Sequence, residues 1–401
     1  MVRRCDRGAN LGVLQPLRPA DYLRTMQFAK VIGHAQLKAK LIGNIRERRI
    51  AHAQLFLGRR GSGDLPMALA YAQYLLCENK GEADSCGECL ACRQMKKLEH
   101  PDLHLMFPIY LEEKKPKTCD RFIAEWRAAV LAQPWLDIDR WRDELESENK
   151  QLRMGVDVAQ DIHRRLGLRS FSGGYKVILI WCPEYMDPAA SNKLLKALEE
   201  PEPNTVFLLV CNNADQLLAT IVSRAQMIKV PGLPADAIAD AVKERYPELS
   251  PEECRAIGLR CDGDLLEAID MAEKGEEELF EFLRSWLRAC FARTVVEAGE
   301  FTDQFQKLGR ERQKSFLVYA LQMIRQCVLQ WQQVPGLVRS IGEENEFVRK
   351  FSKILHYGNA EAIRQELEQS FVHIERNANP KILFMDLSYR IMGLLKSKAP
   401  A

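Results

Sequence analysis

The chain has 401 residues, of which 47% are hydrophobic and 28% are charged, and its formal net charge at pH 7 is +2. This length suits roughly two or three packed domains, and the apolar content is that of a globular protein. A net charge so close to zero argues against a protein that coats nucleic acid, because such binding needs a strongly basic domain. Any contact with DNA is therefore expected to be local.

The first strongly patterned segment opens at Met26. Residues 1–25 carry several arginines but no apolar stretch like that of a secretory signal. We expect a disordered extension or a mis-called start codon there, with a transit peptide as the alternative. The longest apolar runs, such as 177–182, are much shorter than the ~20 residues that cross a bilayer, so no membrane span is expected. Twelve cysteines without an export signal indicate a reducing compartment, and we expect a cytoplasmic protein.

Helix-like and strand-like segments alternate from Met26 to Val230. The first helices are expected at 32–49 and 65–76. Short apolar runs predict buried strands at 53–57, 102–107, 176–181, 205–211 and 227–230. Strands separated by helices indicate an α/β fold with a parallel sheet covered on both faces. Residues 111–155, rich in charge and tryptophan, are expected to form a helical insertion in it.

The sheet pattern ends after Val230, where Pro231-Gly232-Leu233-Pro234 interrupts the chain. Beyond this point the apolar spacing is helical, and helices are expected at 235–245, 251–260, 265–272, 279–294 and 315–332. We predict a small helical domain at 231–275 and a larger helical domain at 276–401.

A glycine-rich stretch, "GRRGSGDL", joins the strand at 53–57 to the helix at 65–76, which is the position of a phosphate-binding loop. Gly58, Gly61 and Gly63 preserve the backbone freedom that such a loop needs. A working loop ends in lysine and then serine or threonine, which supply a point charge and a magnesium ligand. Asp64 and Leu65 occupy these two positions, so the sequence predicts a degenerate loop.

The surrounding residues also argue against nucleotide binding. Asp64 is expected to cap the helix and satisfy its dipole, while Pro66 removes a free N–H donor. Hydrolysis further needs carboxylates at the end of a later strand. Trp181 and Cys182 stand there, and Glu184 lies two residues too late to substitute directly.

Two further motifs connect these features to a known family. Residues 192–201 read N-x-L-L-K-x-L-E-E-P, and Ser223-Arg224-Ala225 follows the next strand. With the glycine loop and the strands, this order resembles the bacterial clamp-loader branch of the AAA+ ATPases, in which the last motif is S-R-C. The resemblance extends over most of the chain from Met26, and residues 374–384 resemble its helical collar, although alone they read as an amphipathic core helix.

Within this branch the motor subunits keep an intact loop and acidic strand end, whereas the delta-prime family has both degraded, and this chain resembles the latter. The resemblance implies an α/β AAA+ domain at 26–230, a helical lid at 231–275 and a collar at 276–401. It implies that the chain binds no ATP and is a non-catalytic subunit of the DNA polymerase III clamp loader. Its partners would be motor subunits of the tau/gamma type and a delta subunit, and through them the sliding clamp and primer-template DNA.

The same resemblance assigns a role to Ser223-Arg224. In clamp loaders the arginine of this motif acts in trans as an arginine finger on the ATP of a neighbouring motor subunit. Arg224 is therefore the expected catalytic contribution of this chain, with Ser223 beside it. Ala225 replaces the usual cysteine, which alters local packing more than charge. Without the family context, a surface ion pair is the favoured interpretation of Arg224.

A C-x8-C-x2-C-x2-C pattern lies after the helix at 65–76 and comprises Cys77, Cys86, Cys89 and Cys92. Two-residue spacers let thiolates converge on one tetrahedral ion, and Gly87 eases the turn, so structural Zn²⁺ is predicted. The clamp-loader resemblance, which places a zinc module here, supports this prediction. His100 and His104 lie nearby but are interpreted as structural, because four thiolates complete the coordination shell.

Two other functions stay open. A divergent ATPase motor subunit would bind and turn over ATP despite the altered loop. A free-standing zinc and DNA-binding protein would bind DNA tightly without partners. Asn212 matches a polar sensor position and is expected to be structural, while the 263–268 segment offers no nucleotide-sensing arginine.

Overall fold

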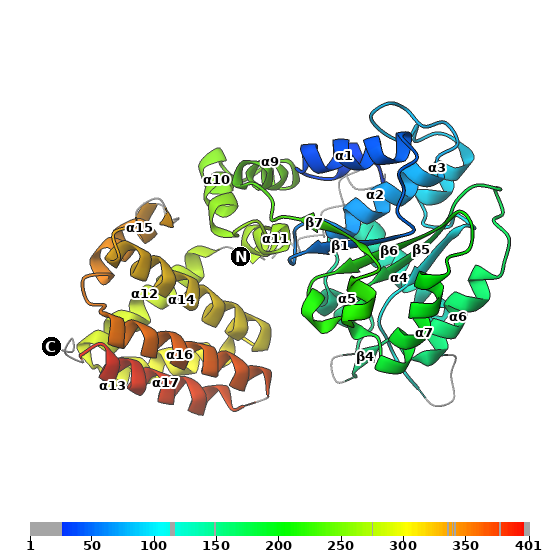
Figure 1. Cartoon of the computed structure of the whole chain (residues 1–401). Helices are drawn as coiled ribbons and strands as arrows, with labels where there is room; N and C mark the ends of the chain where they lie inside the picture. Colours follow the sequence, from blue (N-terminus) through cyan, green and yellow to red (C-terminus); the bar gives the residue numbers. More distant parts are fainter. Residues whose placement is uncertain are drawn as a thin grey trace, which may run out of the picture. The chain divides into compact units, whose positions relative to one another are not determined.

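The computed structural model describes residues 26–112, 117–147, 150–274, 276–334, 337–338, 340, 342–376 and 378–396 (Figure 1). The extension expected at 1–25 lies outside these residues. The chain forms two compact units, one comprising Met1–Arg245 with Asp262–Glu267 and the other Tyr246–Cys261 with Ala268–Ala401. In the described part of the chain, no helix is long and apolar enough to span a membrane.

A five-stranded parallel sheet forms the centre of the first unit, with the strand order β2-β5-β6-β1-β7. The strands are β1 (Ala53–Gly58), β2 (Leu103–Met106), β5 (Lys176–Trp181), β6 (Thr205–Cys211) and β7 (Gln226–Val230). All five strands expected from the sequence are present, each with its ends within one residue of the prediction. Because parallel strands share one carboxyl edge, the segments after β1, β5 and β6 meet at the same edge of the sheet.

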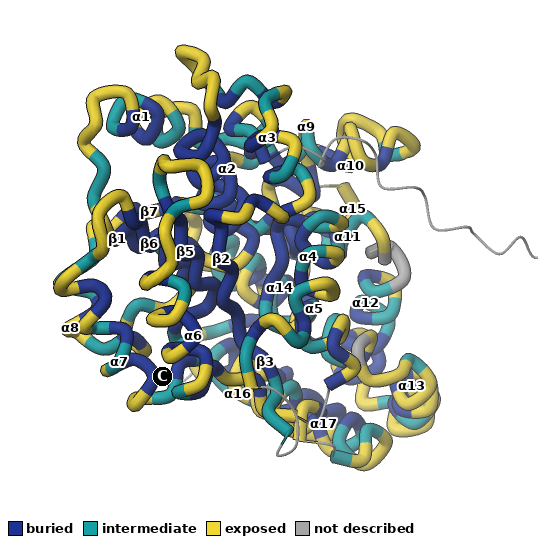
Figure 2. Tube along the Cα trace, turned by 90° about the vertical axis from the view of Figure 1, so that its right-hand side faces the viewer, coloured by how far each residue is buried: buried dark blue, intermediate teal, exposed yellow. Residues whose placement is uncertain are grey.

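Helices cover this sheet, and the most buried of them is α2 (Asp64–Leu76), all of whose residues are buried. The first unit also contains α1 (Ala35–Arg46), α3 (Leu90–Met95), α6 (Val156–Leu166), α7 (Pro188–Glu199), α8 (Ala219–Val222) and α9 (Ala235–Arg245), besides two helices between β2 and α6. Figure 2 shows the buried character of α2 and of strands β1, β2, β5 and β6. The glycine loop thus leads from a buried strand into a buried helix.

The region between β2 and α6 contains α4 (Ile123–Ala132) and α5 (Ile138–Glu144). At its base, β3 (Ile109–Tyr110) pairs with β4 (Leu152–Arg153) in an antiparallel ladder that the sequence did not predict. Phe107 stacks on Trp126 with ring centroids 5.1 Å apart, and Trp141 donates a hydrogen bond to the Pro108 carbonyl at 2.8 Å. Buried tryptophans therefore anchor this region to the sheet.

The second unit is helical. It contains α10 (Pro251–Arg260), most of α11 (Leu265–Lys274), α12 (Glu276–Ala292), α13 (Val295–Lys307), α14 (Arg310–Trp331), α15 (Gly342–Phe351), α16 (Tyr357–Glu375) and α17 (Pro380–Leu394). Its core is aromatic, with Phe305 stacked on Phe384 at 4.1 Å and Trp286 close by. The predicted fold class, a parallel α/β sheet followed by a helical region, is confirmed. The boundaries 231–275 and 276–401 stay predictions.

Candidate functional site

The glycine loop keeps the backbone shape expected from its sequence. Gly61 and Gly63 have φ angles of 66° and 91°, in the left-handed region that favours glycine. A Cβ on Gly58 would lie 2.2 Å from Ser62 Oγ. One expectation is corrected: Gly63 is the N-cap of α2, and Asp64 is the first helical residue and not the capping side chain. The Asp64 side chain was expected to cap the helix, but α2 already begins at Asp64, so the residue before it is the N-cap.

Asp64 is tied to the end of β6. Its Oδ2 accepts a hydrogen bond from Asn212 Nδ2 at 2.8 Å, and its Oδ1 accepts one from the Leu65 N–H at 2.9 Å. The same Asn212 nitrogen donates to the Gly58 carbonyl at 2.9 Å. Burial raises the pKa of Asp64 to about 7. A buried carboxyl group linked to β6 therefore occupies the position where a lysine would face phosphate.

The chain itself covers the loop. Gly61 accepts a hydrogen bond from the Leu265 N–H at 3.2 Å, and a Cβ on Gly61 would lie 1.9 Å from Asp264 Oδ1. Arg60 donates to Asp264 Oδ2 at 2.8 Å and to the buried Asp137 at 2.6 Å. The phosphate cradle is thus faced by the carboxylate of Asp264 and closed by a segment that lies 204 residues from Arg60 in the sequence.

Trp135 adds to this cover from the region between β2 and α6. Its Nε1 lies 3.1 Å from the position that a Cβ on Gly63 would take. Trp135 is buried, and among the described residues its Nε1 has no hydrogen-bond partner. Sequence reasoning missed Asp137, Asp264 and Trp135, because no local motif marks a residue that reaches the loop from a distant segment.

The end of β5 offers no exposed carboxylate. Trp181 and Cys182 are both 2% exposed, so they belong to the core. Glu184 follows in a short 3-10 turn, and its Oε1 accepts a hydrogen bond from the Asn212 N–H at 3.1 Å. Burial raises the pKa of the Glu184 carboxyl. Asn212 therefore binds both Glu184 and Asp64, which fits the structural role expected for it.

Arg224 lies just after α8, at the start of edge strand β7. Its Nη1 donates to the Thr220 carbonyl at 3.0 Å, and its Nη2 lies 2.6 Å from Glu199 Oε1. Ser223 Oγ donates to the same Thr220 carbonyl at 3.1 Å. The Arg224 side chain is 35% exposed. The guanidinium is thus held at the surface by the end of α8 and the end of α7.

The four cysteines of the predicted metal site come together after α2. Cys77 is the C-cap of α2 and Cys89 is the N-cap of α3, so both helix ends contribute a ligand. The Sγ atoms of Cys77 and Cys86 are 3.6 Å apart, and those of Cys86 and Cys92 are 3.9 Å apart. These distances match the edge of ~3.8 Å for a tetrahedron with Zn–S bonds of ~2.3 Å. The residues present therefore fit a tetrahedral thiolate site.

Backbone groups favour the thiolate form of Cys86, whereas burial raises the pKa of Cys77 and Cys92. The Cys89 N–H donates to Cys86 Sγ at 3.3 Å, and the N–H groups of Glu88 and Cys89 lower the pKa of Cys86 to about 6. Gly87, with a φ of 75°, makes the turn expected from the sequence. A thiolate is the form that binds a metal ion.

The two nearby histidines have other partners. His100 Nδ1 accepts from the Asp102 N–H at 3.1 Å, and His104 Nδ1 lies 3.4 Å from an Arg165 nitrogen. Desolvation by burial and the charge of Arg165 lower the pKa of His104 to about 4. Neither histidine belongs to the group of potential metal ligands found in the described residues, which consists of the four cysteines.

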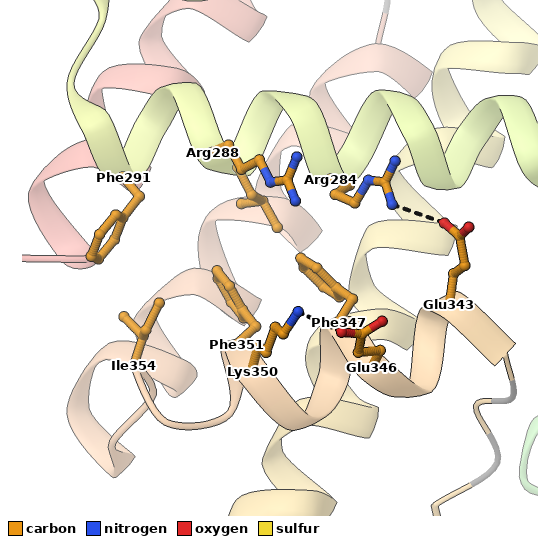
Figure 3. Close-up of a pocket in the computed structure, with 10 residues that line it drawn as sticks. Arg284, Arg288, Phe291, Glu343, Glu346, Phe347, Lys350, Phe351 and Ile354 are labelled. Atoms are coloured by element: carbon orange, nitrogen blue, oxygen red, sulfur yellow. Dashed lines mark hydrogen bonds and ion pairs between the residues drawn. The ribbon is translucent and has the colours of Figure 1, made fainter.

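A separate cavity of about 320 Å³ lies in the second unit between α12 and α15 (Figure 3). Its apolar lining includes Phe347 and Phe351, which stack on each other at 5.2 Å. Across its rim Arg284 pairs with Glu343 at 2.9 Å, as Figure 3 shows. Lys350 pairs with Glu346 in the same lining, which contains no histidine or cysteine among the described residues.

The parallel sheet, the glycine loop between β1 and α2 and the helical region that follows define an AAA+-like α/β protein of the P-loop type. The family described as DNA polymerase III, delta subunit matches residues 33–234, half of the chain. The chain therefore belongs to this family.

Individual relatives agree with this assignment. The chain is 28% identical to DNA polymerase III subunit delta' of Bacillus subtilis (strain 168) over 236 residues, which are 59% of this chain and 58% of that protein. It is 32% identical to the delta' subunit of Pseudomonas aeruginosa over 207 residues, 50% of this chain and 51% of the relative. The tau subunit of Bacillus subtilis is 24% identical over 255 residues, 63% of this chain and 38% of that protein. These matches span little more than half the length of the delta' relatives.

Proposed function

We propose that this chain is a non-hydrolysing, delta-prime-type subunit of the bacterial DNA polymerase III clamp loader. In this role it helps to place the sliding clamp on primed DNA during replication in the cytoplasm. Its partners are motor subunits of the tau/gamma type and a delta subunit. The observation that carries the proposal is the glycine loop closed by the chain's own residues, in a protein that belongs to this family.

In this proposal the subunit binds no ATP, because its loop lacks what phosphate binding requires. Phosphate binding needs free backbone N–H groups and positive charge around an open cradle. Asp64 and Asp264 bring carboxylates to this place, and the Asp264 segment fills the space beside Gly61. At the end of β5, Trp181 and Cys182 offer no carboxylate for hydrolysis. The loop thus acts as a fixed part of the scaffold.

The chemistry that this subunit influences takes place on its neighbour. An arginine offered to the γ-phosphate in trans stabilises the charge that develops during phosphoryl transfer. We assign this role to Arg224, because it stands in the Ser-Arg motif that resembles that of clamp loaders and its side chain is 35% exposed. Ser223 shapes the turn by binding the same Thr220 carbonyl as Arg224.

The cysteine cluster has a structural role in this proposal. Cys77, Cys86, Cys89 and Cys92 would hold one Zn²⁺ ion and join the end of α2 to the start of α3. Four thiolates leave no open coordination position, so the ion supplies stability and no catalytic water.

Three measurements separate the three candidate functions: ATP binding and DNA binding by the purified full chain, and co-purification of the chain with motor subunits. The proposal predicts that the chain co-purifies with motor subunits in a fixed stoichiometry. It also predicts that the chain shows no magnesium-dependent ATP binding at micromolar concentrations. Micromolar binding of labelled ATP with turnover would instead identify a divergent motor ATPase. Tight DNA binding by the chain alone, weakening steeply with salt, would identify a free-standing zinc and DNA-binding protein.

A further inference from the structure

Helix α7 ends with a carboxylate whose position is electrostatically unfavourable. Glu199 is the last residue of α7, where the negative end of the helix dipole favours cations. The preceding carbonyl, that of Leu198, accepts a hydrogen bond from His52 at 3.0 Å. Glu199 itself has Arg224 as its cationic partner, at 2.6 Å. The first glutamate of the N-x-L-L-K-x-L-E-E-P motif therefore pairs with Arg224, which lies beyond the next strand, β6.

This contact fixes the direction of the Arg224 side chain. Two of its nitrogens have partners on different elements, Nη1 at the Thr220 carbonyl and Nη2 at Glu199. A guanidinium has five N–H donors in a rigid plane, so two contacts define its orientation and leave other donors for a ligand. An exposed ion pair contributes little to the free energy of unfolding. We therefore expect the Glu199–Arg224 pair to affect the orientation of the guanidinium more than the stability of the fold.

We propose that Glu199 is a positioning residue for Arg224: it holds the guanidinium in the orientation that acts on the neighbouring subunit's nucleotide. The inference rests on the proposed arginine finger. A donor that is already oriented requires no reorganisation when charge develops at the transferred phosphate. Glu199 therefore affects the rate of the chemical step, whereas the affinity for the nucleotide is set by the neighbouring subunit.

The first test measures DNA-stimulated ATP hydrolysis by the reconstituted complex. Glu199→Gln is expected to lower kcat by about fivefold to tenfold, with the KM for ATP within about twofold of wild type. Glu199→Asp is expected to recover part of this loss. Glu200→Gln is the matched control, because Glu200 is exposed and its side chain makes no hydrogen bond or ion pair with the described part of the chain. Equal rates for Glu199→Gln and Glu200→Gln would overturn the inference.

A double variant separates this inference from the proposed function. If Glu199 acts through Arg224, Glu199→Gln combined with Arg224→Ala is no slower than Arg224→Ala alone. A further loss in the double variant means that Glu199 acts by another route, and the inference fails while the finger stands. An unchanged rate for Arg224→Ala alone removes the finger assignment and this inference together.

A second readout needs no partner subunit. Phenylglyoxal modifies accessible arginines, and mass spectrometry of the peptide containing Arg224 reports its rate of modification in the isolated chain. Glu199→Gln is expected to accelerate this modification, because the guanidinium loses one of its two fixed contacts. Wild type and Glu200→Gln are expected to react at the same rate. No acceleration in Glu199→Gln would contradict the proposed tether.

Discussion

Asp264 lies so close to Gly61 that a Cβ on Gly61 would be 1.9 Å from Asp264 Oδ1. The carboxylate has little freedom to move away, because the N–H of Leu266 donates to the same oxygen at 2.9 Å and Arg60 donates to the other. The backbone nitrogen of Leu265 would also lie 2.7 Å from this Cβ. A side chain at Gly61 would therefore collide with Asp264 and Leu265, which cover the loop.

Replacement of Gly61 by alanine is expected to destabilise the protein strongly. The left-handed φ alone costs about 1–2 kcal/mol, and the contact with Asp264 raises the expected total to about 2–4 kcal/mol. Gly173→Ala is the matched control, because Gly173 has a φ of 69° and nothing within 4 Å of an added Cβ. Urea unfolding of both variants measures the difference. Equal losses of unfolding free energy in the two variants would show that the contact with Asp264 adds no cost.

The pKa of Asp64 predicts a pH dependence of stability. Its carboxyl titrates near 3.8 when unfolded and at about 7 in the fold, because burial disfavours the charged form. The stabilisation by this group is complete below pH 3.8 and is lost as pH rises through 7. Between pH 5 and pH 8, wild type is expected to lose about 2–3 kcal/mol relative to Asp64→Asn. Unfolding free energies at both pH values test this, and parallel pH curves would rule it out.

The cysteine cluster predicts metal content. Untagged protein prepared without chelator should contain about one zinc per chain, since four thiolates converge at tetrahedral distances. Cys89→Ser is expected to remove most of this zinc and to lower the thermal midpoint. Cys327→Ala, a change at a buried cysteine of the second unit, should leave the zinc content unchanged. Wild-type protein without zinc in elemental analysis would refute the assignment.

Local patterns in the sequence predicted the strands of the sheet and pointed to the four cysteines that the fold brings together. The five strands follow from short apolar runs such as Lys176–Trp181, since a strand buried on both faces needs such a run. The convergence of three of the cysteines follows from their spacing, because only two residues separate Cys86 from Cys89 and Cys89 from Cys92. In both cases the residues that determine the structure are neighbours in the chain.

The contacts around the loop and Arg224 could not be predicted in this way. Asp264 and Trp135 reach the glycine loop from distant segments, and Glu199 at the end of α7 meets Arg224 in the segment after α8. Each is a single side chain whose partner is decided by the tertiary fold. The β3–β4 pair was missed for another reason, since two residues per strand show no periodicity.

We propose above all that this chain contributes an arginine to the active site of its neighbour. The most direct test is DNA-stimulated ATP hydrolysis by the complex reconstituted with motor and delta subunits, with wild type and Arg224→Ala compared. Arg153→Ala serves as the control, because Arg153 forms another exposed ion pair, 3.8 Å from Asp187. We expect Arg224→Ala to fold and assemble but to hydrolyse ATP about 10³-fold more slowly, with Arg153→Ala near wild type. A wild-type rate for an assembled Arg224→Ala complex would contradict the claim.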